Sequence, residues 1–268
     1  ETLVFFRNLF GLLVLLPWVA HRGLGGLGTR VLPLHLLRGL AGLAAMYCFF
    51  YAIAHLPLSE AMLLKLTAPL FIPFLALFWL KEQVSFQVGG GLLIGFAGVL
   101  LVLNPGWQQT DPAALIALLG GFFAAIVQVD IRRLSDTEPG PRIVFYFAAI
   151  GTLASIFPLP WAWTTPSGPE YLALFAVAAF ATLGQLFMTK GLAIAPAAPM
   201  GAFSYFSVIF AAIFGWWLWD EQPGTSSLIG TLLVILAGAL VGRWRRTPKP
   251  LPDGDSLGTM GTKEADNG

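Results

Sequence analysis

Lys65 is a charged residue inside an apolar stretch, residues 58–80, that is long enough to cross a membrane. Pro69 and Pro73 follow at steps of four, so the three side chains share one stripe of a helix. Because proline cannot donate a helical hydrogen bond, two backbone carbonyls lose their partners beside this cation. The pattern predicts a polar cavity within the membrane and a helix bent at Pro69 and Pro73. An ion pair of Lys65 with Glu60 or another carboxylate, or extension of Lys65 to the membrane surface, would also explain it.

Arg7, followed by Asn8, is the second candidate, about five residues into the first apolar stretch. Arginine suits planar anions, which favours a substrate site, although an arginine at the membrane interface would look the same. Glu60 stands two residues into its stretch. It is interpreted as a coupling carboxylate, an interfacial charge, or the partner of Lys65 or Arg7.

Uncharged polar residues complete the candidate set. Gln128 and Gln185 lie among apolar residues, where an amide needs a hydrogen-bonding partner from a ligand or another helix. The remaining candidates would line the cavity or pack against other helices, and they are Ser204, Tyr205, Tyr47 and Tyr51.

Three further polar residues, Arg38, Lys190 and Asp130, lie near the ends of their apolar stretches. We expect them to reach the membrane surface or to pair locally, Asp130 with Arg133. They are not assigned to the site.

Motifs for chemical catalysis are absent from the sequence. It has no H-E-x-x-H, G-x-S-x-G or Walker motif, its three histidines are scattered, and its one cysteine, Cys48, lies in an apolar run. We therefore predict no enzyme activity, no cofactor and no metal site.

The composition indicates a membrane protein. Hydrophobic residues make up 57% of the chain and charged residues 11%, whereas charged residues are about a quarter of a soluble domain. A net charge of +1 without a basic stripe excludes a nucleic-acid-binding protein. The expected partners are membrane lipid and a small-molecule substrate, with coupling to a proton or another ion left open.

Apolar stretches of about 20 residues predict an all-α membrane protein, a multi-spanning helical bundle. Nine stretches are visible in the sequence. They are residues 2–20, 34–54, 58–80, 87–104, 112–133, 142–161, 170–190, 198–219 and 226–244. Residues 247–268 are polar and rich in Pro and Gly, which predicts a disordered cytoplasmic tail.

The chain contains a duplicated unit. Glu82-Gln83 recurs as Glu221-Gln222, 139 residues later, and Pro57 and Gly91 recur at the same spacing. The stretch at 112–133 has no counterpart upstream, so we expect ten helices in the intact protein, with one before Glu1. Two units of five helices form an inverted repeat, because an odd number of crossings reverses the second unit.

Basic residues collect at alternate ends of the predicted helices, ten against none. Since lysine and arginine mark cytoplasmic loops, the C-terminus is predicted to be cytoplasmic. Trp161, Trp163, Trp216, Trp217 and Trp219 would then anchor the outer surface.

Glycines at positions 91, 95 and 98, and at 230, 238 and 242, predict close helix packing.

The runs LPLSEAMLLKLTAPLFIPFLALFWLKEQ and APAAPMGAFSYFSVIFAAIFGWWLWDEQ, each followed by a Gly-rich helix, resemble the EamA-type families of the drug/metabolite transporter superfamily. The resemblance implies residues 1–105 as a first repeat that lacks its first helix, and residues 106–246 as a second. It also implies a central cavity between the repeats and alternating access. Val208 replaces Pro69 in the second repeat, so only the first of the two core helices is expected to be bent by proline.

These observations predict a secondary transporter or exporter of a small metabolite, of the amino acid or organic anion class. The alternative is a receptor or assembly subunit that keeps the fold without transport. We expect a multi-pass protein of the bacterial inner membrane, as a monomer or a weak homodimer.

Overall fold

The computed structural model describes residues 2–56, 58–103, 112–220 and 224–243, which form helices and no strands. Seven helical segments there are long and apolar enough to cross a membrane, and two shorter apolar helices accompany them. Each of the nine predicted stretches corresponds to one of these helical segments. The predicted all-α, multi-spanning class is confirmed. Residues 247–268, predicted to be a disordered tail, lie outside the described residues.

The first half consists of α1 (Thr2–Arg22), η1 (Leu24–Leu27), α2 (Leu32–His55), α3 (Leu58–Lys65), α4 (Ala68–Leu75), η2 (Ala76–Leu80) and α5 (Phe86–Leu103). The second half consists of α6 (Pro112–Leu134), α7 (Gly140–Ile156), α8 (Leu159–Ala162), α9 (Gly168–Ile194), α10 (Ala197–Ala202), η3 (Phe203–Tyr205), α11 (Phe206–Trp219) and α12 (Thr225–Gly242). Both halves are helical because, in lipid, a helix satisfies its backbone polar groups internally.

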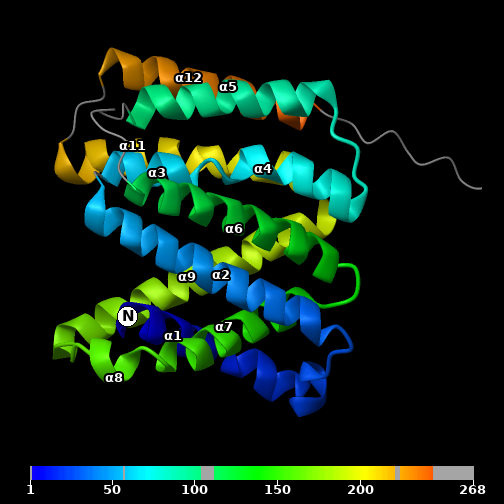
Figure 1. Ribbon diagram of the computed structural model, residues 1–268, viewed down its shortest axis with the longest axis vertical. Coiled ribbons are helices and arrows are strands. Elements are labelled where there is room, and N and C mark those ends of the chain that lie inside the picture. The colour runs from blue at the N-terminus through cyan, green and yellow to red at the C-terminus, as the bar shows by residue number, and fades with distance from the viewer. Residues whose placement is uncertain (1, 57, 104–111, 221–223, 244–268) are drawn as a thin grey trace, which may run out of the picture.

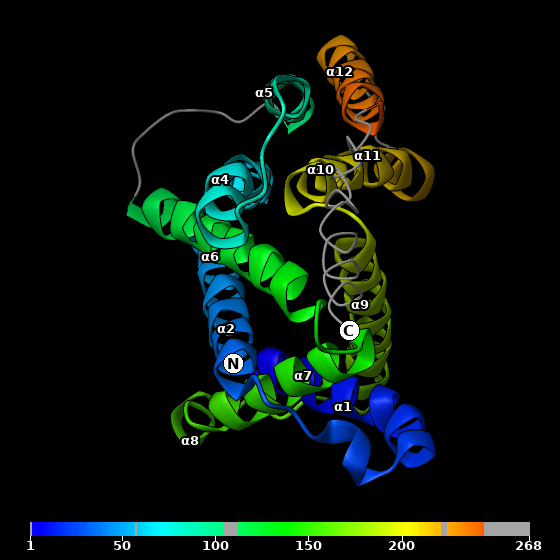
Figure 2. The ribbon, with the colours of Figure 1, turned by 90° about the vertical axis from the view of Figure 1, so that its right-hand side faces the viewer.

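Equivalent helices of the two halves run in opposite directions (Figure 1). α1 packs against α7, and α5 packs against α12. Viewed along the helices, α2 and α6 lie on one side, α9 and α10 lie on the other, and α1 and α7 close the lower end (Figure 2). This antiparallel pairing is what an inverted repeat produces.

The α5–α12 contact depends on glycine. A Cβ atom on Gly98 would come within 2.6 Å of the Gly230 carbonyl oxygen, and one on Gly230 within 2.5 Å of the Gly98 carbonyl oxygen. No larger residue fits at this crossing, so the predicted role of these glycines in helix packing is confirmed.

The core rods of both halves are interrupted. In the first half the helix stops at Lys65 and restarts at Ala68, ahead of Pro69, and the Thr67 hydroxyl donates to the Leu64 carbonyl at 2.6 Å. In the second half the 3-10 segment η3 separates α10 from α11 without a proline. The second interruption arises without a proline, so the two core helices are interrupted by different local structures. Ser204, the repeat counterpart of Lys65, sits in that second interruption.

The connections α1–α2, η2–α5 and α6–α7 lie at one end of the helices, on the right in Figure 1. They and the adjoining helix ends carry a set of basic residues, and we call this end the basic end. Its basic residues are Arg22, Arg30, Lys81, Arg132, Arg133 and Arg142. The connections α2–α3 and α8–α9 lie at the opposite end.

Among the side chains that the structure describes, four tryptophans are exposed, in or beside α8 and in α11, as interfacial anchors would be. They are Trp161, Trp163, Trp216 and Trp217.

Candidate substrate cavity

A cavity of about 430 Å³ lies inside the bundle and is lined from both halves of the chain. Its walls come from α1, α2 and α3 of the first half and from α6, α7, α9 and η3 of the second. The volume falls within the range of about 300–1,000 Å³ that small-molecule sites occupy. A closed interior, which would have favoured a protein without transport, is not found in the described residues.

Three cations line this cavity: Arg7, Arg38 and Lys65. Arg38 is 1% exposed, donates from Nη2 to Oε1 of Gln185 at 2.7 Å, and lies 4.1 Å over the ring of Phe147. Arg7 lies 5.8 Å from the same ring. All three cations therefore depend on groups that carry no full negative charge.

Arg7 also donates from Nη1 to the sulfur of Met46 at 3.6 Å, and the Lys65 ammonium lies 4.4 Å over the ring of Phe49. Thioether sulfur is a weak acceptor and a ring face is a weak anion substitute, so both cations keep unused capacity for a stronger acceptor.

No acidic residue is among the described residues that line the cavity. None of the ion pairs found in the described part of the chain involves Arg7, Arg38 or Lys65. The suggested pairing of Lys65 with Glu60 is thus not formed. The cavity is electropositive, and three ring-backed cations can meet a carboxylate or phosphate.

Neutral polar groups stand beside the cations. Gln128, 9% exposed, and Gln185 present amides to the cavity, and Ser204 adds a hydroxyl from η3. The structure therefore brings together Arg7, Lys65, Gln128, Gln185 and Ser204 from the predicted set. Amide oxygens accept and amide nitrogens donate, so this wall can bind neutral or ammonium groups as well as anions.

Other predicted residues lie elsewhere. Asn8 is 2% exposed and donates to the Val4 carbonyl at 2.9 Å, against Gly151 of α7. Tyr205 is fully buried against Gly95 of α5, so it is a core residue. Glu60 is not among the residues that line the cavity.

Tyr47 and Tyr51 line a separate pocket of about 530 Å³ between α1, α2 and α6. Tyr51 also stacks on His55, with 4.0 Å between the ring centroids.

Arg38 and Asp130 were expected to reach the membrane surface or to pair locally, and the structure buries both. Arg38 is buried because α7 and α9 cover it with Phe147 and Gln185. Asp130 is 0% exposed and forms no ion pair with Arg133 in the described structure. The burial of Arg38 is consistent with its distance from the helix end, because it lies six residues after the start of α2.

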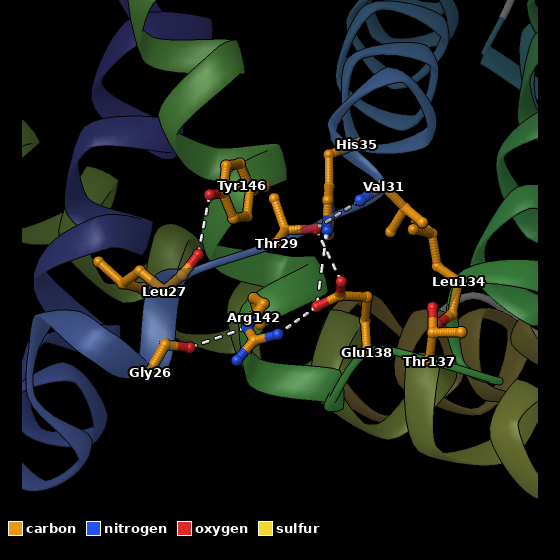
Figure 3. A network of polar contacts seen from close by, with 10 residues as sticks. All are labelled: Gly26, Leu27, Thr29, Val31, His35, Leu134, Thr137, Glu138, Arg142 and Tyr146. Carbon is orange, nitrogen blue, oxygen red and sulfur yellow. Dashed lines mark hydrogen bonds and ion pairs between the residues drawn. The ribbon is translucent and has the colours of Figure 1, made fainter.

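A second polar region lies at the basic end (Figure 3). Its residue on α2, His35, comes three residues before Arg38. We call it the Glu138 cluster, made of Thr29, His35, Glu138, Arg142 and Tyr146. The Glu138 carboxylate accepts from the Thr29 hydroxyl at 2.7 Å and from Arg142 Nη1 at 2.6 Å. His35 Nε2 lies 3.9 Å from the same carboxylate, and its ring stacks on Tyr146 at 4.3 Å.

The Glu138 cluster joins the α1–α2 connection to the start of α7. Arg142 Nε donates to the Gly26 carbonyl at 2.8 Å, and the Tyr146 hydroxyl donates to the Leu27 carbonyl at 2.9 Å. The sequence indicates this region only as a connection between helices. The spacing of Glu138 and Arg142, four residues apart, is the signal for their pairing.

The described residues contain no group of three or more His, Cys, Asp or Glu side chains that could hold a metal ion.

A family comparison identifies the protein class. The model of the EamA-like transporter family matches residues 1–104 and 111–243. The chain belongs to the EamA-like transporter family. It is therefore a transporter and not an enzyme, and the family that the sequence resembles is confirmed.

Curated relatives of this EamA-like chain are transporters of different solutes. It is 32% identical over 247 residues to a pseudopaline exporter, CntI, of Pseudomonas aeruginosa, an alignment that covers 91% of this chain and 86% of the relative. It is 28% identical to an S-adenosylmethionine uptake transporter of Rickettsia felis, over 87% and 79% of the two chains. A riboflavin transporter of Vibrio cholerae is 24% identical, over 91% and 83%. Transport of a small metabolite is thus supported, whereas the direction differs among the relatives.

A solved crystal structure shares the fold, with a TM-score of 0.76 over 91% of this chain and 89% of that chain. The sequence identity is 20%, so this likeness concerns the fold alone.

Proposed function

We propose that this EamA-like protein is a secondary active transporter of a small organic anion or amino acid, working by alternating access through the cavity between its two halves. The observation that carries the substrate class is the set of three cations, Arg7, Arg38 and Lys65, without an acidic residue among the described lining residues. Where water is scarce, such charges favour an anion far more than they do at a surface.

Each part of the wall suits a part of such a substrate. The planar guanidinium of Arg38 can bind a carboxylate with paired hydrogen bonds, and Lys65 can act as a point charge. Phe49 and Phe147 give the cavity apolar faces beside these cations. An amino acid would place its ammonium group at Gln128 or Gln185, whose side-chain oxygens accept hydrogen bonds.

The membrane orientation belongs to the same proposal. The basic end, together with the C-terminus, faces the cytoplasm of a bacterial cell, because basic residues are retained on that side. Reporter fusions at residues 107 and 250 should then report opposite sides of the membrane. Both reporters on one side would contradict this orientation.

The decisive experiment is transport by the full-length protein in proteoliposomes. The panel should contain L-glutamate, citrate, inorganic phosphate, a neutral sugar and an organic cation, with protein-free liposomes as control. Accumulation or exchange of the anionic or amino acid members, and not of the sugar or the cation, is the expected result. Transport of the cation alone would contradict the substrate class. Failure of every member would favour the alternative of a receptor or assembly subunit.

A further inference from the structure

Asp130 is a buried carboxylate next to the cavity that the proposed function leaves unused. It lies on α6 three residues after Val127, which lines the cavity, so it shares roughly the same helix face one turn closer to the basic end. Its side chain is 0% exposed, and neither of its oxygens has a hydrogen-bond partner in the described structure. An ionised carboxylate without partners is costly at such a place, whereas a protonated one is much less so.

Arg38 is the group that connects Asp130 to the cavity. Its Nη2 is used by Gln185, whereas its Nε is buried without a partner. The charges of Arg38 and Asp130 interact, yet no ion pair joins them in the described part of the chain. Arg38 therefore lines the cavity, interacts with an acid that has no hydrogen-bond partner, and keeps a donor for either of them.

The other charged groups around Asp130 come from the elements packed on α6. On α6 itself, Arg133 interacts with Asp130 and also lies 5.8 Å from the ring of Trp79. α4, η2 and α10 carry no titratable residue. The remaining titratable side chains nearby or on the packed helices are engaged elsewhere, exposed or distant along their helix. They include Arg132 of α6, which pairs with Glu82 and Asp136, and His35 of α2, which lies near Glu138. The others are Tyr47, Cys48, Tyr51 and His55 of α2, Glu60 and Lys65 of α3, and Glu170, Tyr171 and Lys190 of α9.

We infer that Asp130 is the proton-binding site that couples transport in this protein, with Arg38 shared between Asp130 and the substrate. The inference rests on the proposed anion substrate. A proton from water adds to one oxygen of the Asp130 carboxylate, which becomes neutral and no longer attracts Arg38. The guanidinium of Arg38 then interacts with the anion in the cavity without competition from Asp130. When the proton leaves, Asp130 recovers its charge, competes for Arg38 and weakens anion binding.

Binding of proton and anion is mutually favourable under this scheme, because linkage is reciprocal. One proton would accompany each anion, so an anion with a single negative charge would cross the membrane without net charge. The affinity for the anion should rise as the pH falls, by at most about tenfold per pH unit, the limit for one linked proton.

The first test needs no substrate. Infrared titration of the full-length protein in lipid nanodiscs should show a carboxylic-acid C=O band that disappears as the pH is raised from about 5 to 9, a range in which an ordinary aspartate is ionised throughout. Asp130→Asn should lack this band and keep the fold, because asparagine resembles the protonated acid in shape. Asp136→Asn, an exposed aspartate six residues further along, is the matched control and should keep the band. An Asp130 that is ionised over the whole range would overturn the inference.

The second test measures coupling directly. In weakly buffered solution, L-glutamate or citrate should take up protons on binding to the wild-type protein. Asp130→Asn should lose the proton uptake, and its binding of the anion should be independent of pH. Arg38→Gln should also lose the proton uptake but should retain the infrared band. Equal proton uptake by wild type and Asp130→Asn would overturn the coupling while leaving anion transport standing. A titrating Asp130 in a protein that binds neither probe would instead count against the proposed substrate class.

Discussion

In the cavity, Arg38 contacts an amide oxygen and a ring face, whereas in the Glu138 cluster Arg142 pairs with a carboxylate at 2.6 Å and a backbone carbonyl at 2.8 Å. The two arginines are the same residue type, and they lie in neighbouring polar layers of one bundle. Arg142 has the acceptors that a structural arginine needs. Arg38 lacks a carboxylate within ion-pair distance among the described residues.

The charge of Arg142 therefore stabilises the fold, whereas the charge of Arg38 remains available to bind an anion. A buried ion pair with further hydrogen bonds satisfies both partners, and removing one leaves the other stranded. Removing a cation that is held only by ring faces and an amide destabilises the ligand-free protein less. Such a cation contributes most of its interaction energy when an anion binds. The two regions should therefore respond differently to substitution.

The largest effect on stability is expected for Glu138→Gln. It leaves Arg142 without its carboxylate and weakens the link between η1 and α7, so the free energy of unfolding should fall by about 3 kcal/mol. Reversible unfolding in mixed micelles measures this loss. Transport per folded molecule should change by less than about tenfold, equivalent to about 1.4 kcal/mol.

The double variant Glu138→Gln with Arg142→Met provides the control for this pair. It should lose less stability than the sum of the two single variants, because they share one interaction. Unchanged stability with abolished transport would place the Glu138 cluster in the transport cycle instead.

The largest effect on transport is expected for Arg38→Met. Methionine keeps the contact with Phe147 but removes the charged donor, so transport of an anion should fall about 100-fold, equivalent to about 2.7 kcal/mol. Initial rates in proteoliposomes at equal protein abundance measure the effect. Arg38→Lys keeps the charge without the planar donor pair, and it should recover part of the loss. An Arg38→Met protein that transports the same anion normally would show that Arg38 is structural.

A smaller loss is expected for Lys65→Met, about tenfold, because Lys65 acts as a point charge worth roughly 1.4 kcal/mol of binding. Lys190→Met is the matched control, since Lys190 is an exposed lysine of α9 and does not line the cavity. It should transport like the wild type. Equal rates for both variants would make Lys65 a residue of the fold or of the membrane surface.

The sequence predicted the membrane-spanning helices well, because a membrane crossing depends on the length and polarity of a single stretch. Lys65, Gln128 and Gln185 were found for the same reason, since a polar residue stands out in an apolar run. The sequence did not show which face of each helix points toward lipid and which toward the protein core. Lipid-facing and core-facing residues are both apolar, so Tyr205 was expected at the cavity although it packs against Gly95.

The missed residues depend on contacts between distant parts of the chain. The predicted stretch began at residue 34, which set Arg38 close to a helix end, yet α7 and α9 bury it. Glu138 is paired with Thr29, 109 residues away, through a connection that looked like a simple break between helices. A single sequence gives no signal for such pairings until the packing of the helices is known.

The smallest effect is expected for Asp136→Asn, which tests whether charge pairing alone explains the stability difference between the two regions. Asp136 accepts from Arg132 at 2.9 Å, a distance close to that of the Glu138–Arg142 pair, but its side chain is 64% exposed whereas that of Glu138 is 4% exposed. Water replaces the lost partner at an exposed site, so the free energy of unfolding should change by less than about 1 kcal/mol. Arg132 also lies 3.3 Å from Glu82, which keeps its charge compensated. A loss as large as that of Glu138→Gln, measured by the same unfolding experiment, would mean that pairing at the basic end stabilises the protein regardless of burial.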